Sequence, residues 1–417
     1  GMSPARFFYT LLLYVLLPRA LLHLWWRARR QPAYLEHVDE RFGRYAFNAK
    51  EPLIWVHAVS VGETRAAAPL IEALMRKHPQ HRVLLTHMTP TGRETGVALF
   101  ADDVQRCYLP YDFPAAVERF LGHFNPACGI LLETEIWPNL IHACRARGVP
   151  IYLVNARLSE KSFGRYARFR TFAAACLHEL SGIAAQSRED AARLQDLGAR
   201  PVVVTGNLKF DITPPLELVA RGAAWRGQWV RSRPVLLCAS TREGEEALLL
   251  NALAVTDVPD LLTVIVPRHP QRFDEVAALL ERAGIAYQRR SADLPVDSQT
   301  RIVLGDSMGE MFAYYAACDV AIIGGSLLPF GAQNLIEACA SGRPVIVGPH
   351  TYNFAEATQL AVAAGAALQV PDAVSALAAA QALLNDTARA QKMTQAGLEF
   401  TRSHQGAAVR AVELLVF

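Results

Sequence analysis

The sequence predicts an α/β protein built from two doubly wound domains, each with a parallel sheet, and preceded by an apolar helix. Three observations support this prediction. The chain of 417 residues is too long for one ordinary domain and fits two of roughly 200 residues. Short apolar runs alternate with helical or polar segments along both halves, as they do in parallel α/β sheets. The start of the chain differs from the rest because it is almost continuously apolar.

The composition excludes several classes of protein. With 52% hydrophobic and 19% charged residues the chain can bury large cores. The net charge of +3 is small, so we expect no nucleic-acid partner. The seven cysteines are scattered without a C-x-x-C pair, which favours reduced thiols in a cytosolic compartment. The twelve histidines include no H-E-x-x-H pair, and we expect no metal site.

Residues 1–30 are predicted to form a membrane anchor helix. The stretch 7–26 would be about 30 Å long as a helix, which matches the apolar thickness of a bilayer. However, Pro18, Arg19 and His23 interrupt its apolar character. A helix that lies in or dips into one leaflet is therefore favoured over a full span. The alternative is a helix docked on the protein's own core.

The first domain is expected over residues 31–212 and contains five apolar runs of strand length. Helical or polar segments separate the runs, so the strands should be parallel, with helices on both faces of the sheet. The predicted strands are residues 54–59, 82–88, 127–132, 151–155 and 182–185.

The second domain is expected over residues 213–417, because the paired prolines Pro214 and Pro215 end regular structure. Its last helix can return to the first domain. Ligands of such folds bind beyond the carboxyl ends of the strands. The predicted strands are residues 235–239, 261–266, 301–304, 319–323 and 344–347.

Acidic residues follow two predicted strands of the first domain. Glu63 stands beside Gly62 at the start of a helix, and Glu135 follows the strand at 127–132. A carboxylate at a helix N-terminus should stay ionised because the helix dipole stabilises it, and it can act as a general base on a hydroxyl. The simpler interpretation is that Glu63 only complements the dipole. The neighbouring glycine would let a substrate come close.

The strand ends of the second domain carry cations instead. Arg242 follows the first strand of this domain, and Arg268 and His269 follow the second. We therefore expect a donor with phosphate and carboxylate groups on the basic side, and a neutral hydroxyl acceptor on the acidic side.

Two further loops of the second domain fit a nucleotide. Met308, Gly309 and Glu310 belong to a tight loop in which the methionine offers an apolar face to a base. Asn334 and Glu337 share one helix face after a glycine-rich turn. Asn334 is near the helix start, which favours a phosphate, and Glu337 can accept hydrogen bonds from a ribose. The alternative is an ordinary βαβ unit whose glycines serve only the turn.

Eight motifs stand in order along nearly the whole chain. They are SVGE, ETEIWPN, NARLSEKSFGRY, GNLKFD, STREGEE, PRHPQRF, GDSMGEM and GGSLLPFGAQNLIEA. Together they closely resemble the bacterial Kdo transferase family. Its members are GT-B-type glycosyltransferases of lipopolysaccharide synthesis that transfer Kdo (3-deoxy-D-manno-oct-2-ulosonic acid).

The resemblance implies a GT-B fold with two Rossmann-like domains that face a cleft. It implies CMP-Kdo as the donor, the lipid A precursor lipid IVA as the acceptor, and inversion at the anomeric carbon. It implies that neither a cofactor nor a catalytic metal is used. It also implies that the N-terminal helix attaches the enzyme to inner-membrane lipid at the cytoplasmic face.

The resemblance also implies roles for single residues. Glu63 matches the family's catalytic base, and Glu135, on the acceptor side with Gly62, matches an acidic position. Lys209 and Arg242 are candidates to bind the donor carboxylate or phosphate. The other positions that match donor contacts are Arg268, His269, Met308, Gly309, Glu310, Asn334 and Glu337.

The chain departs from the family pattern in two places. The loop at residues 330–335 is less rich in His, Gly and Pro, and Arg242 stands where His is frequent. Two other classes of protein fit part of the pattern. Another GT-B nucleotide-sugar enzyme, such as a UDP-sugar transferase or epimerase, would share the layout. A membrane-bound nucleotide sensor would have no use for Glu63.

Overall fold

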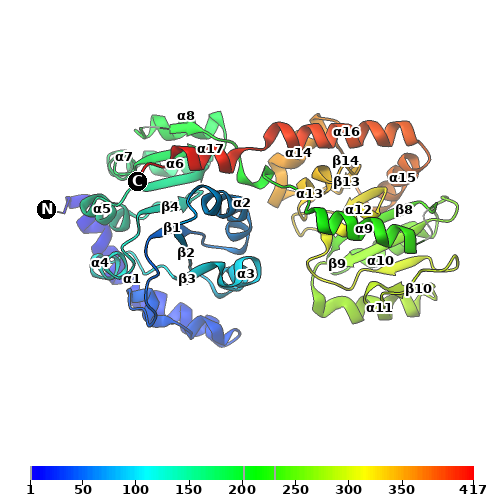
Figure 1. Ribbon diagram of the computed structural model, residues 1–417, viewed down its shortest axis with the longest axis horizontal. Helices are drawn as coiled ribbons and strands as arrows, with labels where there is room; N and C mark the ends of the chain where they lie inside the picture. Colours follow the sequence, from blue (N-terminus) through cyan, green and yellow to red (C-terminus); the bar gives the residue numbers. More distant parts are fainter. Residues whose placement is uncertain (1, 201, 230–231) are drawn as a thin grey trace. The chain divides into compact units, whose positions relative to one another are not determined.

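The computed structural model describes residues 2–200, 202–229 and 232–417, so Gly1, at the start of the predicted anchor, lies outside the described residues. The chain forms two compact units (Figure 1). Unit 1 consists of residues 1–211 and 405–417, and unit 2 of residues 212–404. The C-terminal segment therefore belongs to the same unit as the N-terminal half.

Unit 1 is built on seven parallel strands in the order β3-β2-β1-β4-β5-β6-β7. The order reverses between β1 and β4, and doubly wound folds bind ligands at such a reversal. The strands are β1 (Leu53–His57), β2 (Arg82–His87), β3 (Val104–Tyr108), β4 (Cys128–Leu132), β5 (Ile151–Ala156), β6 (Gly182–Ala185) and β7 (Val202–Val204). The helices are α1 (Pro4–Ala28), α2 (Val61–Lys77), α3 (Pro90–Phe100), α4 (Pro114–Phe124), α5 (Pro138–Arg147), α6 (Glu160–Ala167), α7 (Arg170–His178), α8 (Arg188–Asp196) and α17 (Ala407–Leu414).

The sheet of unit 1 has an apolar core on each face. Successive residues of a strand point to opposite faces, so Leu53 and Trp55 of β1 pack in one core and Ile54 and Val56 in the other. Burial on both faces explains why the central strands are continuous apolar runs.

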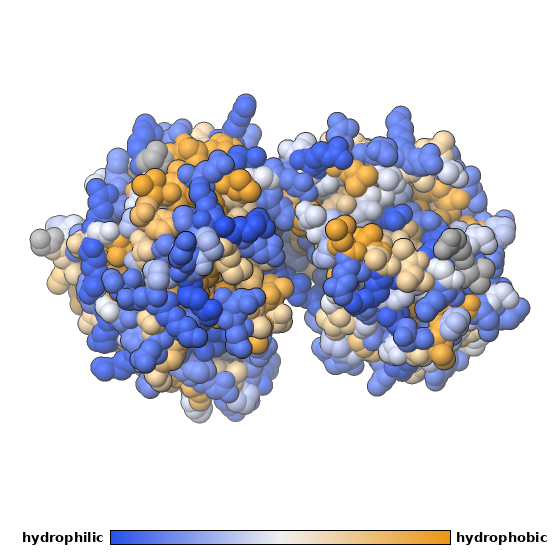
Figure 2. Space-filling view, in the orientation of Figure 1, coloured by the Kyte–Doolittle hydropathy of each residue, from blue (hydrophilic) through white to orange (hydrophobic). Residues whose placement is uncertain are grey.

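Unit 2 repeats this architecture with strands in the order β10-β11-β9-β8-β12-β13-β14, all parallel. On the face shown in Figure 2, hydrophilic residues surround apolar patches in each unit. The strands are β8 (Val235–Thr241), β9 (Leu262–Pro267), β10 (Tyr287–Arg289), β11 (Ile302–Leu304), β12 (Val320–Ile323), β13 (Val345–Val347) and β14 (Ala367–Gln369). The helices are α9 (Leu216–Gln228), α10 (Glu245–Leu253), α11 (Phe273–Arg282), α12 (Met311–Ala317), α13 (Leu335–Ala340), α14 (Ala355–Ala363), α15 (Ala373–Leu384) and α16 (Thr387–His404).

The predicted fold class is confirmed, because both units are doubly wound α/β structures with parallel sheets. All ten predicted strands are present, with ends that differ by one or two residues. Four strands were missed, namely β3, β7, β10 and β14, and these are the two edges of each sheet. Edge strands are shorter or less completely buried, so they lack the apolar run that identified the central strands.

Helix α1 continues through Pro18 and is long and apolar enough to cross a membrane, by length and composition alone. Its large apolar side chains are mostly exposed, among them Phe8, Val15 and Leu22. A soluble protein rarely exposes so many apolar residues side by side, so this surface suits a lipid environment.

A few polar contacts dock α1 on the rest of unit 1. The Tyr9 hydroxyl donates to Asp112 Oδ2 at 2.8 Å. The Asn139 amide donates to the hydroxyl of Thr10 at 2.9 Å. Asp112 also accepts the backbone N–H groups of Asn139 and Leu140 at 3.0 and 2.8 Å, so it caps the start of α5. One carboxylate thus holds the apolar helix and α5 together.

Helix α17, drawn red in Figure 1, packs beside α2 in unit 1. Its buried face includes Ala407, Ala411 and Val412. Asp211 fixes its start, because its carboxylate accepts the backbone N–H groups of Gly406 and Ala408 at 2.6 and 2.7 Å. The end of the chain is therefore attached where the first half of unit 1 ends.

We expect Asp211→Ala to loosen α17 without changing unit 2. Loss of this cap should cost about 1–2 kcal/mol, so amide hydrogen exchange across residues 407–414 should accelerate about tenfold. Asp372→Ala is the matched control, since it removes the cap of α15 in unit 2. Unchanged exchange in α17 of the Asp211 variant would show that the cap does not hold the helix.

Candidate active site

The carboxyl ends of β1 and β4 meet at one edge of the unit 1 sheet. The strands are parallel neighbours, with His57 opposite Leu131 near their ends. Residues that follow level strand ends lie close together. Glu63 follows β1, and Glu133 and Glu135 follow β4, both near enough to raise the pKa of Glu63. Three carboxyl groups therefore form an acidic cluster at this edge.

Ser60 fixes Glu63 in the first turn of α2. The Ser60 hydroxyl accepts the Glu63 N–H at 3.3 Å and donates to the Glu63 carboxylate at 3.4 Å. A Cβ added at Gly62 would have Ser60 Oγ, at 4.0 Å, as its nearest neighbour among the described residues. The fold itself therefore does not require glycine there, and Gly62 leaves open space beside Glu63.

The other two carboxylates of the cluster are held in different ways. Glu133 has a left-handed backbone with φ 61°, a conformation that is uncommon outside glycine, and it pairs with Arg157 at 3.7 Å. Glu135 accepts a short hydrogen bond of 2.6 Å from the indole Nε1 of Trp137. These contacts keep both negative charges near Glu63.

Burial raises the pKa of Glu63 to about 8, and the negative charges of Glu133 and Glu135 contribute to the rise. The expectation that Glu63 stays ionised is therefore wrong at neutral pH. Desolvation and like-charge repulsion outweigh the helix dipole and the hydrogen bonds from Ser60. A carboxyl group with this pKa can exchange a proton with a substrate near physiological pH.

Glu245 organises the glycine-rich loop of unit 2. Its buried carboxylate accepts the backbone N–H groups of Arg242 and Gly325, both at 2.7 Å. Gly324 packs against the backbone of Ser240 so closely that a Cβ would not fit. Both features stabilise the conformation of the loop itself. This is the role expected of glycines in an ordinary βαβ turn, the alternative to a phosphate-binding turn.

Three arginines lie near enough to His269 of unit 2 to affect its pKa. Burial lowers the pKa of His269, and the positive charges of Arg242, Arg268 and Arg272 lower it further. The imidazole is therefore neutral at pH 7, where it can donate or accept one hydrogen bond at each nitrogen. The predicted cationic side of unit 2 is carried by the arginines and not by the histidine.

Two of these arginines are fixed by neighbouring side chains. Arg272 forms two hydrogen bonds with the buried Glu246 carboxylate, at 2.7 and 3.1 Å. Arg242 lies over the ring of Phe330, with its Cζ 4.4 Å from the ring centroid. Arg242 and Phe330, two positions expected to depart from the family pattern, therefore contact one another.

The loop after β11 carries the next predicted residues. Met308 is exposed, and Gly309 has φ 76°, which favours glycine. Glu310 forms ion pairs with Arg221 of α9 at 2.9 Å and with Arg290 at 3.7 Å. The Glu310 side chain therefore ties the loop to α9 and to Arg290, whereas the Met308 side chain is exposed to solvent.

Asn334 and Glu337 lie at the start of α13, as predicted from their spacing. The Asn334 side chain accepts the Ile336 N–H at 2.9 Å and donates to Glu337 Oε1 at 3.5 Å. One of the N–H groups expected to face a phosphate is therefore already bonded to Asn334.

Lys209 belongs to unit 1. It is half-buried and lies in the single turn Leu208–Phe210, which follows β7 in the sequence.

The predicted acidic residues thus lie in unit 1. The residues predicted to bind the donor lie in unit 2, except Lys209, which lies in unit 1. Glu133 is the first residue of the acidic strand end ETEIWPN expected from the sequence, although no separate role was expected for it. No role was expected for Trp137 or Glu245. No sequence signal shows that Trp137 bonds to a carboxylate or that Glu245 turns back to the loop around Gly325.

Among the residues described, no group of three or more His, Cys, Asp or Glu side chains is arranged to hold a metal ion. The cysteines are buried thiols, and burial raises the pKa of Cys128 to about 12. Such a thiol is a poor nucleophile at neutral pH.

Comparison with known proteins gives the family. Residues 36–212 match the model of the family described as 3-deoxy-D-manno-octulosonic-acid transferase (kdotransferase). A 3-deoxy-D-manno-octulosonic acid transferase of Bordetella pertussis is 48% identical over 98% of this chain and 98% of its own length. The chain belongs to the Kdo transferase family. Another family member, from Haemophilus influenzae, is 38% identical over 98% of each chain.

The likeness to solved structures confirms the GT-B fold predicted for this Kdo transferase. A UDP-GlcNAc 2-epimerase of Neisseria meningitidis, bound to UDP-GlcNAc, covers 87% of this chain and 99% of its own, with a TM-score of 0.58. At 18% identity this likeness shows the fold alone. Family membership confirms the predicted resemblance and makes the protein a glycosyltransferase that transfers Kdo in lipopolysaccharide biosynthesis.

The acidic cluster generates a prediction for the pH dependence of Kdo transfer. Below its pKa Glu63 holds a proton and cannot accept another, so kcat/KM should rise with pH and reach half its maximum near pH 8. Glu133→Gln removes a repelling charge, so the rise should move toward acid by about one pH unit. Initial rates measured across the pH range test this.

The matched control for this prediction is Glu118→Gln, which changes a surface carboxylate of unit 1 that pairs with Arg147. Its pH profile should coincide with that of the wild type. A profile that stays the same in the Glu133 variant would contradict the electrostatic coupling of the cluster.

The glycine-rich loop generates a second prediction. Glu245→Gln loses the charge that attracts several N–H donors of the loop, which should weaken its attachment by roughly 1.5–3 kcal/mol. Amide exchange at residues 325–328 should therefore accelerate at least about tenfold. Glu243→Gln, at the exposed neighbouring position, should leave that exchange unchanged, and equal exchange in both variants would contradict the role of Glu245.

Proposed function

We propose that this Kdo transferase moves Kdo from CMP-Kdo to lipid IVA, the lipid A precursor, with inversion at the anomeric carbon. The observation that carries the proposal is the environment of Glu63. It is a half-buried carboxyl group with a pKa of about 8, beside open space at Gly62. Such a group is suited to take a proton from a sugar hydroxyl.

In the proposed mechanism Glu63 removes the proton of an acceptor hydroxyl as its oxygen attacks the anomeric carbon of Kdo. A new C–O bond forms on the face opposite the nucleotide. The bond from that carbon to the phosphate oxygen breaks, and its electron pair leaves with CMP. Bond breaking runs ahead, so the sugar ring gains positive charge as in glycosidases. The charges of Glu133 and Glu135 favour both proton transfer and this developing charge.

The donor is proposed to bind at the strand ends of unit 2. Arg242 and Arg268 would contact the phosphate and the Kdo carboxylate, because guanidinium groups match both anions. Neutral His269 would supply one further hydrogen bond. The loop from Met308 to Glu310 would contact the base, and Asn334 with Glu337 would contact phosphate and ribose. Lys209 is a further candidate to bind the donor carboxylate.

We further propose that the reaction needs no metal ion or cofactor. Support comes from the arginines around His269, since fixed cations can stabilise the charge that develops on the departing phosphate. On this proposal, transfer proceeds equally well in the presence of a chelator such as EDTA.

The apolar surface of α1 supports a site of action at a membrane. We propose that α1 attaches the enzyme to the cytoplasmic face of the inner membrane, where a glycolipid acceptor and a soluble nucleotide sugar can both reach it. Trp25 and Trp26 are exposed near the end of the helix and are suited to the headgroup region.

The direct test is mass spectrometry of the glycolipid formed from CMP-Kdo and lipid IVA in detergent. The wild type should add one or more Kdo masses. Glu63→Gln should lower turnover by about 10²-fold or more, while calorimetry shows unchanged CMP affinity. Arg268→Ala should instead weaken CMP binding.

Two results would contradict the proposal. Turnover like the wild type in the Glu63 variant would remove this residue from the role of base. Absence of product with CMP-Kdo, together with activity on UDP-sugars, would indicate another GT-B chemistry.

A further inference from the structure

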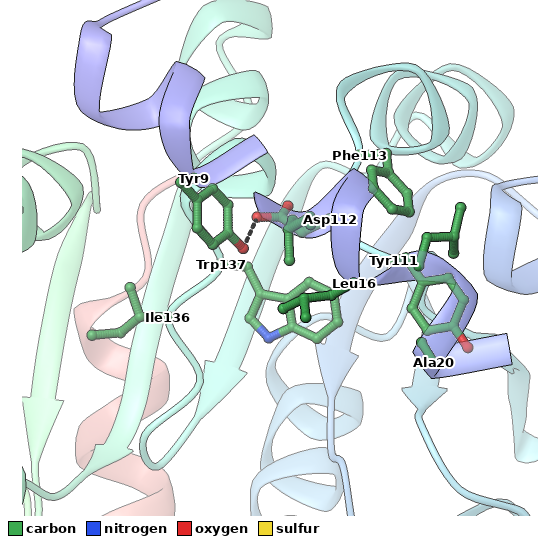
Figure 3. Close-up of a pocket in the computed structure, with 10 residues that line it drawn as sticks. Tyr9, Leu16, Ala20, Tyr111, Asp112, Phe113, Ile136 and Trp137 are labelled. Atoms are coloured by element: carbon green, nitrogen blue, oxygen red, sulfur yellow. Dashed lines mark hydrogen bonds between the residues drawn. The ribbon is translucent and has the colours of Figure 1, made fainter. Parts of the chain in front are cut away.

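An apolar pocket of about 240 Å³ lies between α1 and the loops after β3 and β4 of unit 1 (Figure 3). One wall comes from α1 through Leu13, Leu16 and Ala20. The opposite wall comes from residues 111–113 and 136–137. An apolar cavity of about 150 Å³ already holds benzene, so this pocket has room for several methylene groups.

Two polar side chains at the pocket, Tyr9 and Asp112, already have hydrogen-bond partners. The Tyr9 hydroxyl and the Asp112 carboxylate bond to one another at 2.8 Å, as Figure 3 shows. Asp112 also accepts the N–H groups of Asn139 and Leu140. A ligand therefore finds mainly leucine, alanine and aromatic surface, which favours a hydrocarbon over a polar molecule.

Trp137 joins this pocket to the acidic cluster. Its indole lines the pocket, while its Nε1 donates to Glu135 at 2.6 Å. Glu135 in turn lies near enough to Glu63 to raise its pKa. Trp137 therefore contacts both the pocket and a member of the acidic cluster.

The same helix that forms one wall of the pocket carries the apolar surface suited to lipid. Leu12, Val15 and Leu22 of α1 are exposed, and Leu13, Leu16 and Ala20 interleave with them along the helix. The residues that line the pocket and those exposed to solvent thus belong to one apolar helix. This continuity points to an occupant that comes from the membrane.

We propose that the pocket holds one acyl chain of the glycolipid acceptor while the acceptor's sugar hydroxyl lies at Glu63. The inference rests on the proposed function. The acceptor is chosen over ordinary bilayer lipid because Trp137 joins the pocket to the acidic cluster, so a lipid that carries a sugar hydroxyl can place it at the proposed base. Trp137 thereby contacts both the chain and the carboxylate that faces the sugar.

The kinetic test fills the pocket in two ways, with Ala20→Phe and with Leu13→Phe. Each methylene kept out of an apolar site weakens binding about fourfold, so the KM for lipid IVA should rise about tenfold or more. The KM for a fully deacylated acceptor and the affinity for CMP should not change. Leu12→Phe, on the exposed face of α1, is the matched control and should resemble the wild type.

A second test does not depend on catalysis. Lipid IVA with a photoreactive group midway along an acyl chain should crosslink to peptides that contain residues 13–20 and 136–137. Unlabelled lipid IVA should suppress the crosslink, and an equal excess of phosphatidylethanolamine should not. Suppression by the phospholipid would assign the pocket to bilayer lipid and overturn the proposal.

The outcomes separate this inference from the proposed function. Wild-type Kdo transfer with an unchanged KM in both pocket variants would overturn the acyl-chain site and leave the function intact. A rise in KM that extends to the deacylated acceptor would also overturn it, because the variants would then disturb the catalytic groups. Absence of transfer by the wild type would overturn the function, and the crosslink would still report whether the glycolipid occupies the pocket.

Discussion

The parallel pairing of β1 with β4 is the constraint on which the acidic site depends. Because the two strands end level with one another, the residues that follow them cannot avoid close approach. Glu63 therefore meets Glu133 and Glu135 in a partly desolvated environment, which raises its pKa. The left-handed backbone of Glu133 is consistent with strain that is retained at a functional site.

The docking of α1 connects the membrane-facing surface to this site. Asp112 binds Tyr9 of α1 and also caps α5, whose first residue follows Trp137. Burial raises the pKa of Asp112 to about 7, although its hydrogen bonds to Tyr9 and to the start of α5 oppose that rise. The loop that carries Glu133 and Glu135 therefore leads directly into α5, the helix that Asp112 links to α1. This arrangement supports the proposed acceptor, which is part sugar and part hydrocarbon.

Much of the architecture could be predicted because the central strands are buried on both faces and form continuous apolar runs. The edge strands could not be predicted in this way, because β3 and β10 include polar residues that interrupt any apolar run. Glu63 and Glu135 were found from their positions after strands. The protonation of Glu63 was predicted wrongly, because desolvation and the approach of Glu133 arise only once the strands pair. The role of Glu245 in the loop around Gly325 likewise depends on contacts between distant residues.

Crowding at the strand ends raises the pKa of Glu63 to about 8, which suits its proposed role as the base. The most direct measurement is the infrared difference spectrum between the wild type and Glu63→Gln, recorded as a function of pH. A protonated carboxyl band that belongs to Glu63 should be present at neutral pH and disappear with a midpoint near pH 8. Loss of that band near pH 4.5, the ordinary value for a glutamate, would contradict it.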